Sequence, residues 1–159
     1  MKFSTNSTMT KILDELFSTY SERVPNVRKI TSEMVKNGMV KDQNEIINDH
    51  VAFRTMGVKN LGINSFEKIF LAHGYEKRDF FHFKVKKLDA YWYAPPTPDL
   101  PRIFISELKV DLLSKKVRKI IRKYTDSVIF DPVDQINLND AEAVSRFFQN
   151  TFWELPSIE

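Results

Sequence analysis

The sequence predicts an α+β fold: N-terminal helices, then one βαβββ module with a curved mixed sheet, then C-terminal helices. Two patterns lead to this class. Apolar residues recur at helical spacing before residue 38 and after residue 111, and short strand-like segments lie between residues 48 and 109. The length of 159 residues and a hydrophobic fraction of 42% suit one ordinary domain. We therefore expect a single domain, 1–159, with helical parts at 8–38 and 111–150 and the module at 48–109.

The N-terminal part is expected to contain two helices. Pro25 separates them, because its ring disrupts a helix interior, and the second helix should end near Gly38. A polar connector at 41–48 follows. The first helix, at 10–23, is indicated by apolar residues at helical spacing: Ile12, Leu13, Leu16, Phe17 and Tyr20.

The module is expected to begin with a strand at 50–55. A helix should follow at 64–73, with Asn64 or Ser65 as its N-cap and Gly74 just past its end. Three more strands are indicated at 80–86, 90–94 and 102–108, and prolines interrupt the last gap. This order of elements can build one curved, half-open sheet with the helix on its outer face.

The C-terminal part is expected to contain a basic amphipathic helix at 111–124 and another helix at 139–150. The basic residues could contact nucleic acid or attract acidic metabolites. We favour a solvated helix face instead, because no aromatic residues interleave with the charges. Nucleic acid is therefore not an expected partner. The basic residues are Lys115, Lys116, Arg118, Lys119, Arg122 and Lys123.

Several classes of protein are disfavoured by composition. The chain has no cysteine, which excludes disulfides and thiolate metal sites. No apolar run approaches the roughly 18 residues needed to span a membrane, and the first ten residues lack the apolar stretch of a signal peptide. We therefore expect a cytoplasmic protein with no membrane partner.

The segment at 48–55 is the most informative for function. In a strand, alternate residues share a face, so His50, Ala52 and Arg54 should point the same way while the residues between them face the core. Imidazole is a common metal ligand, and arginine binds carboxylates through two donors. A metal together with a carboxylate-bearing substrate is one interpretation. The alternative is a His50 hydrogen-bonded to Asp49 or to a backbone carbonyl, with Arg54 in a salt bridge.

Glu107 is the second candidate metal ligand, because it ends an apolar strand. It could equally pair with Arg54 or cap the following turn. Ile103 and Ile105 share its face, which indicates the end of a buried stripe, and a buried carboxylate needs a partner.

The other histidines and two tyrosines are weaker candidates. His82 should lie on a solvent-side or helix-covered face and is not expected to bind metal. His73 precedes Gly74 at an expected helix end, where a histidine complements the helix dipole. Tyr91 and Tyr93 should share a strand face, where they could line a pocket or belong to ordinary sheet packing.

Several motifs occur in the same order as in a known family. Together they resemble the 2-oxoadipate dioxygenase/decarboxylase family over roughly residues 8–156, and motifs in order are more specific than any one of them. They are Asn48-Asp49-His50-Val51-Ala52-Phe53-Arg54-Thr55, His73-Gly74-Tyr75, Lys86-Lys87-Leu88-Asp89-Ala90-Tyr91-Trp92-Tyr93 and Leu100-Pro101-Arg102-Ile103-Phe104-Ile105-Ser106-Glu107-Leu108.

The resemblance implies a fold and an activity. The family is related to vicinal-oxygen-chelate proteins, which pair βαβββ modules around a metal. Its members use Fe(II) and O2 to convert 2-oxoadipate to 2-hydroxyglutarate and CO2 in lysine breakdown. By this resemblance His50 would be the first iron ligand and would touch substrate, and Arg54 would bind a substrate carboxylate.

The resemblance also implies that part of the active site is missing. In the family, the second histidine and the glutamate ligand come from a second module, and this sequence has no histidine after His82. The family role of the glutamate therefore does not transfer to Glu107. Three outcomes are open: a piece of a longer enzyme, a short form that completes its site in a homodimer, or a non-catalytic module for small-carboxylate binding or dimerisation.

Overall fold

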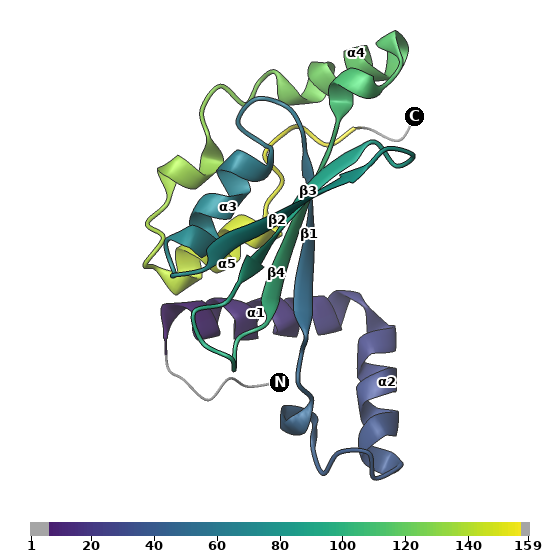
Figure 1. Cartoon of the computed structure of the whole chain (residues 1–159), viewed down its shortest axis with the longest axis vertical. Coiled ribbons are helices and arrows are strands. Elements are labelled where there is room, and N and C mark those ends of the chain that lie inside the picture. The colour runs from purple at the N-terminus through teal and green to yellow at the C-terminus, as the bar shows by residue number, and fades with distance from the viewer. Residues whose placement is uncertain (1–6, 157–159) are drawn as a thin grey trace.

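The computed structural model describes residues 7–156, and Figure 1 shows how their elements are arranged. The N-terminal part contains α1 (Thr8–Arg23) and α2 (Pro25–Lys36), followed by a 3-10 turn, η1 (Gln43–Glu45). Ser7 caps α1, because its hydroxyl accepts a hydrogen bond from the backbone N–H of Thr10. The two expected N-terminal helices are therefore present.

The expected βαβββ order follows. Helix α3 lies between the first and second strands, and the remaining strands are consecutive. The bounds are β1 (His50–Met56), α3 (Ile63–Leu71), β2 (Glu76–Phe83), β3 (Leu88–Ala94) and β4 (Arg102–Leu108).

The C-terminal part contains two helices and two 3-10 turns. Ser114 caps the basic helix α4 and Asp140 caps α5, each through its side-chain oxygen. In Figure 1, α4 and α2 project at opposite ends of the molecule. The bounds are η2 (Val110–Leu112), α4 (Lys115–Thr125), η3 (Pro132–Gln135) and α5 (Ala141–Gln149). None of the helices in residues 7–156 has the length and apolar content to cross a bilayer.

The four strands form a mixed sheet in the order β1-β4-β3-β2. Strand β1 runs parallel to β4, and the other two pairings are antiparallel. The register places His50 beside Arg102 and Arg54 beside Ser106. Because paired residues share a face, this register decides which side chains from β1 and β4 meet.

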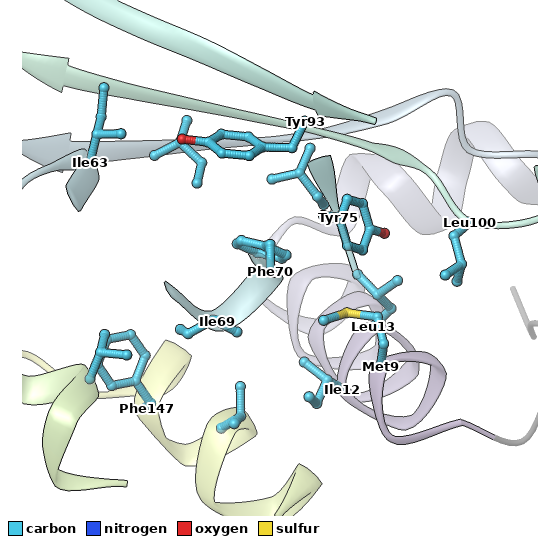
Figure 2. Packing of buried hydrophobic residues seen from close by; sticks show 14 residues of the cluster. Met9, Ile12, Leu13, Ile63, Ile69, Phe70, Tyr75, Tyr93, Leu100 and Phe147 are labelled. Atoms are coloured by element: carbon cyan, nitrogen blue, oxygen red, sulfur yellow. The ribbon is translucent and has the colours of Figure 1, made fainter. Parts of the chain in front are cut away.

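One face of the sheet carries the hydrophobic core. Tyr93, Ile103 and Ile105 are fully buried against α1, α3 and α5, and Val51 and Phe53 pack at the margin of the same cluster. Figure 2 shows residues of three helices meeting the sheet in this core: Met9, Ile12 and Leu13 of α1, Ile69 and Phe70 of α3, and Phe147 of α5. The helices therefore hold β1 from one side.

Several boundaries differ from the sequence-based expectations, those of β2, α3 and α4 among them. Strand β2 begins at Glu76, not at residue 80, and every residue in it is exposed. The N-cap of α3 is Gly62, not Asn64 or Ser65. Helix α4 begins at Lys115, because residues 110–112 form a 3-10 turn and Ser114 supplies the cap.

Candidate functional site

The face opposite the core carries the candidate site, and we call it the open face. The expected alternation along β1 is present: His50, Ala52 and Arg54 are exposed, whereas Val51, Phe53 and Thr55 are partly buried. The residues of β4 at the matching register positions complete the open face. It is formed by His50, Ala52, Arg54, Arg102, Phe104 and Ser106.

His50 is held by its neighbour in sequence. Its side chain is 58% exposed, and its Nδ1 lies 3.0 Å from Oδ2 of Asp49. The other oxygen of Asp49 accepts a hydrogen bond of 3.0 Å from Nη1 of Arg102 on β4. Because a carboxylate can only accept, Nδ1 is the donor in this contact, and in the neutral form of the ring Nε2 carries the lone pair. A neutral imidazole oriented by a carboxylate is the usual arrangement of a metal-binding histidine.

Arg54 is held by a hydroxyl group. Its Nε donates a hydrogen bond of 3.0 Å to Oγ of Ser106. Among residues 7–156, no carboxylate forms an ion pair with the Arg54 guanidinium, so the salt bridge considered as an alternative is not found there. The guanidinium therefore presents two Nη groups that can bind an anion.

A groove of about 690 Å³ runs beside β1 and joins these two residues to an aromatic wall. His50, Ala52 and Arg54 line it, together with Asn48 and Asn150. The wall comes from α1, β1, α3 and the C-terminal part, through Phe17, Tyr20, Phe53, Phe66, Phe147, Phe148 and Phe152. Aliphatic chains pack favourably on such a wall, and a carboxylate in the groove can reach Arg54.

Glu107 does not join His50. Its register partner on β1 is Thr55, so its side chain lies on the core face of the sheet, whereas His50 lies on the open face. There Oε2 accepts a hydrogen bond of 3.0 Å from the backbone N–H of Ile63, at the start of α3. A metal site shared by His50 and Glu107 is therefore not formed within this chain, and a capping role accounts for the carboxylate.

His82 lies in an ion-pair cluster on the same side as Glu107. Its Nδ1 is 2.7 Å from Asp89 Oδ1, and Lys109 Nζ is 2.9 Å from Asp89 Oδ2. Burial alone would raise the pKa of Asp89, but the bonds from Lys109 and His82 outweigh it, so the pKa is lowered. The charged carboxylate thus has two partners in place.

His73 and the two tyrosines have structural roles. Helix α3 ends at Leu71, two residues before His73, and the Nε2 of His73 lies 2.9 Å from the carbonyl oxygen of Leu138. Tyr93 is fully buried and donates to Glu67 Oε2 over 2.6 Å. Tyr91 packs against Phe80, with Lys77 above its ring. Ordinary sheet packing therefore describes both tyrosines.

Two residues of the site were missed in the sequence, Arg102 and Ser106. Both lie on β4, about 50 residues after β1, and only the β1–β4 register brings them beside His50 and Arg54. No local pattern marks them. Asp49 was named as a hydrogen-bond partner of His50, and it takes that place.

The open face carries one candidate metal ligand, His50. Nε2 of His50 fits a metal-binding role, but the described residues contain no group of three His, Asp or Glu side chains that could hold an ion. A complete set of donors therefore needs groups from outside residues 7–156 of one copy.

The four strands, with α3 between the first two, form a βαβββ module whose sheet order is β1-β4-β3-β2. A putative glyoxalase superfamily protein from Ralstonia eutropha has the same fold, with a TM-score of 0.59 at 19% identity over 82% of this chain and 46% of that one. The chain belongs to the 2-oxoadipate dioxygenase/decarboxylase family, whose model matches residues 12–159. This agrees with the resemblance read from the motifs.

Two curated plant proteins are similar to the chain. The chloroplastic 2-oxoadipate dioxygenase/decarboxylase of Arabidopsis thaliana is 37% identical over 137 residues, 79% of this chain and 36% of that protein. The chloroplastic/amyloplastic protein of rice (Oryza sativa) is 41% identical over 123 residues, 71% of this chain and 33% of that protein. The chain thus spans about a third of these relatives. Their plastid location contradicts the expectation of a cytoplasmic protein, which was wrong.

Two solved structures share the fold more closely. Rice hydroxyglutarate synthase in complex with 2-oxoadipate has a TM-score of 0.74 and 34% identity, over 91% of this chain and 46% of that one. A putative hydrolase from Shewanella frigidimarina has a TM-score of 0.67 and 27% identity, over 91% of this chain and 51% of that one. The chain therefore matches about half of each structure.

Proposed function

We propose that this chain forms the His50 and Arg54 half of the active site of a 2-oxoadipate dioxygenase/decarboxylase. The reaction converts 2-oxoadipate and O2 to 2-hydroxyglutarate and CO2, which balances in atoms, and its physiological place is lysine breakdown. One observation carries the proposal: His50 and Arg54 share the open face, where Asp49 contacts Nδ1 of His50 and Ser106 contacts Nε of Arg54. Membership of the family supports it.

The two residues have separate roles in this proposal. Arg54 binds one carboxylate of the substrate through its Nη groups, and His50 lies near the 2-oxo acid end. Ala52 lies between them on the same face, and Phe104 is its register partner on β4. A small residue there leaves room for the methylene chain, and the Phe104 ring offers it an apolar surface.

The proposed metal is Fe(II), with Nε2 of His50 as one ligand. Iron of this kind, held by two histidines and a carboxylate, supplies the activation of O2. In this proposal the other two donors come from a longer form of the chain or from the partner in a homodimer. Asp49 and Arg102 keep the His50 ring in the orientation that a ligand needs.

A second candidate function is non-catalytic binding of small carboxylates, or dimerisation without catalysis. The observation that favours it is the single well-placed histidine among the described residues. In that case Arg54 binds a dicarboxylate and no metal takes part.

The test is an anaerobic Fe(II) titration of the purified chain, with and without 2-oxoadipate, followed by measurement of O2 consumption. If a homodimer completes the site, the enzyme proposal expects stoichiometric iron binding and O2 uptake that depends on 2-oxoadipate. If the other donors belong to a longer form, this chain alone should bind 2-oxoadipate but neither hold iron tightly nor consume O2, and a longer form should do both. Dicarboxylate binding without iron would support the binding module instead. Binding of neither ligand would contradict the enzyme proposal and the carboxylate-binding module, and would leave dimerisation, which the oligomeric state of the chain tests.

Two histidine variants make the test specific. His50→Ala should abolish iron binding with little change in thermal stability, because the His50 side chain is 58% exposed. His82→Ala is the matched control, since that side chain is 49% exposed and bonded to an aspartate, but on the other face. Equal loss of iron in both variants would count against His50 as the ligand.

A further inference from the structure

The hydroxyl group of Ser106 lies between Arg54 and the backbone of β1. It accepts a hydrogen bond of 3.0 Å from Nε of Arg54 and donates one of 3.2 Å to the carbonyl oxygen of Phe53. Ser106 is only 5% exposed. A buried hydroxyl with both a donor and an acceptor role filled has a fixed orientation.

Ser106 is also fixed through its backbone. Thr55 Oγ1 donates a hydrogen bond of 3.0 Å to the carbonyl oxygen of Ser106, and the β1–β4 register places Ser106 beside Arg54. On its other side the register partner is Ala90, which is fully buried. The serine therefore has little freedom, and the position of its Oγ is determined by the sheet.

This contact decides which edge of the Arg54 guanidinium is available. An arginine can bind a carboxylate either through Nε and one Nη group or through both Nη groups. Ser106 occupies Nε, so the pair of Nη groups remains for a ligand. Without the serine, an exposed arginine side chain would sample several rotamers, and fixing one of them would oppose binding.

We propose that Ser106 is a positioning residue that holds the Arg54 guanidinium so that its two Nη groups receive the substrate carboxylate. This inference rests on the proposed role of Arg54 in binding 2-oxoadipate. Ser106 itself does not touch the ligand. Its effect is to prearrange the arginine, which raises affinity without adding a contact.

The test compares Ser106→Ala with the wild-type chain by calorimetric titration of 2-oxoadipate. We expect the affinity to fall roughly tenfold, as for the loss of one hydrogen bond to a charged group. Ser65→Ala is the matched control, because Ser65 is 6% exposed and also donates a side-chain hydrogen bond, to Asp131, away from the open face. Its affinity should equal that of the wild type.

A double variant shows whether Ser106 acts through Arg54. If it does, Ser106→Ala should weaken binding no further in an Arg54→Ala background. In NMR spectra, the Nε–H signal of Arg54 should be protected from exchange in the wild-type chain and in Ser65→Ala, and should lose this protection in Ser106→Ala. That readout needs no ligand and reports the hydrogen bond alone.

The outcomes separate this inference from the proposed function. Wild-type binding that Ser106→Ala leaves unchanged would overturn the role of Ser106 while Arg54 keeps its own. Additive losses in the double variant would also overturn it. Absence of 2-oxoadipate binding by the wild-type chain would overturn the proposed function, and this inference with it, even where the Nε–H signal is protected.

Discussion

Glu107 caps a helix that lies more than 40 residues before it in the sequence: its Oε2 accepts a hydrogen bond of 3.0 Å from the backbone N–H of Ile63. The N-cap residue of α3 is Gly62, which has no side chain to take that role. The carboxylate also places a negative charge at the positive end of the helix. The end of β4 is thereby tied to the start of α3.

Replacing this carboxylate should weaken the fold and spare the candidate site. We expect Glu107→Ala to lower the free energy of unfolding by about 1–2 kcal/mol, as for other lost helix caps, and Glu107→Gln, which keeps an acceptor oxygen, to lower it less. Urea unfolding measures both. Because Glu107 lies on the core face, 2-oxoadipate and iron binding should be unchanged; loss of iron in the stable Gln variant would contradict this placement.

Two glycines near this contact should differ in their tolerance of alanine. A Cβ on Gly57 would lie 2.4 Å from the carbonyl oxygen of Leu108, which belongs to the backbone of the sheet. A Cβ on Gly62 would lie 2.6 Å from Oε2 of Glu107, and that side chain can move. We expect Gly57→Ala to cost about 2–3 kcal/mol and Gly62→Ala about 1 kcal/mol, the value of the cap.

Urea unfolding also tests the expectation that Gly57→Ala costs more stability than Gly62→Ala. Gly62→Ala should add little in a Glu107→Ala background, because the cap is already lost there. A larger cost for Gly62→Ala than for Gly57→Ala would show that the Glu107 side chain is held more rigidly than we infer.

His73 should make stability depend on pH. Burial lowers its pKa below the ordinary value of 6.5, although the bond to the Leu138 carbonyl acts in the opposite direction. As the pH falls, the unfolded chain therefore takes up the proton first, and the folded state loses stability. This contribution is fully present above pH 6.5 and is lost as the pH falls toward the folded-state pKa.

The variant for this prediction is His73→Gln, which keeps an N–H donor for Leu138 and does not titrate. Between about pH 7.5 and pH 5.5 the free energy of unfolding should fall more for the wild type than for this variant. Parallel curves would show that His73 has the same pKa in both states.

Ala52 should control access to the space between His50 and Arg54. Leucine at this position should weaken 2-oxoadipate binding by about tenfold or more, because it fills the space that the methylene chain needs. Stability should change by about 0.5 kcal/mol or less, since Ala52 is exposed. Ala72→Leu, at an exposed position after α3, is the control. Unchanged binding in Ala52→Leu would place the ligand elsewhere.

The module could be predicted well where local patterns are strong. Strand β4 has the bounds that its apolar alternation indicated, and the two faces of β1 are as expected. Strand β2 was placed too late, because Glu76 to Asp79 are all charged and exposed and have no alternation to read. The first residues of β2 belong to the strand because their backbone pairs with β3, and not because their side chains are buried.

The site could be predicted only in part, for a geometric reason. His50 and Arg54 lie on one strand, where every second side chain points to the same face, so the sequence alone predicted that they share a face. Ser106 and Glu107 are adjacent in sequence yet point to opposite faces, and only the register with β1 tells which of them meets Arg54. The sequence offered Glu107 as one possible partner of Arg54, and the structure brings Ser106 there instead.

The parallel pairing of β1 with β4 also bears on the order of folding. Arg54 and Ser106 are 52 residues apart, whereas β2, β3 and β4 follow one another as an antiparallel meander. Contacts between distant residues require closure of a long loop and form slowly. We therefore expect β1 to dock on a meander that is already formed, so that the pairing of His50 with Arg102 and of Arg54 with Ser106 is completed late. A ligand held by Arg54 would then act on the first strand to detach, and would slow the unfolding of the whole chain.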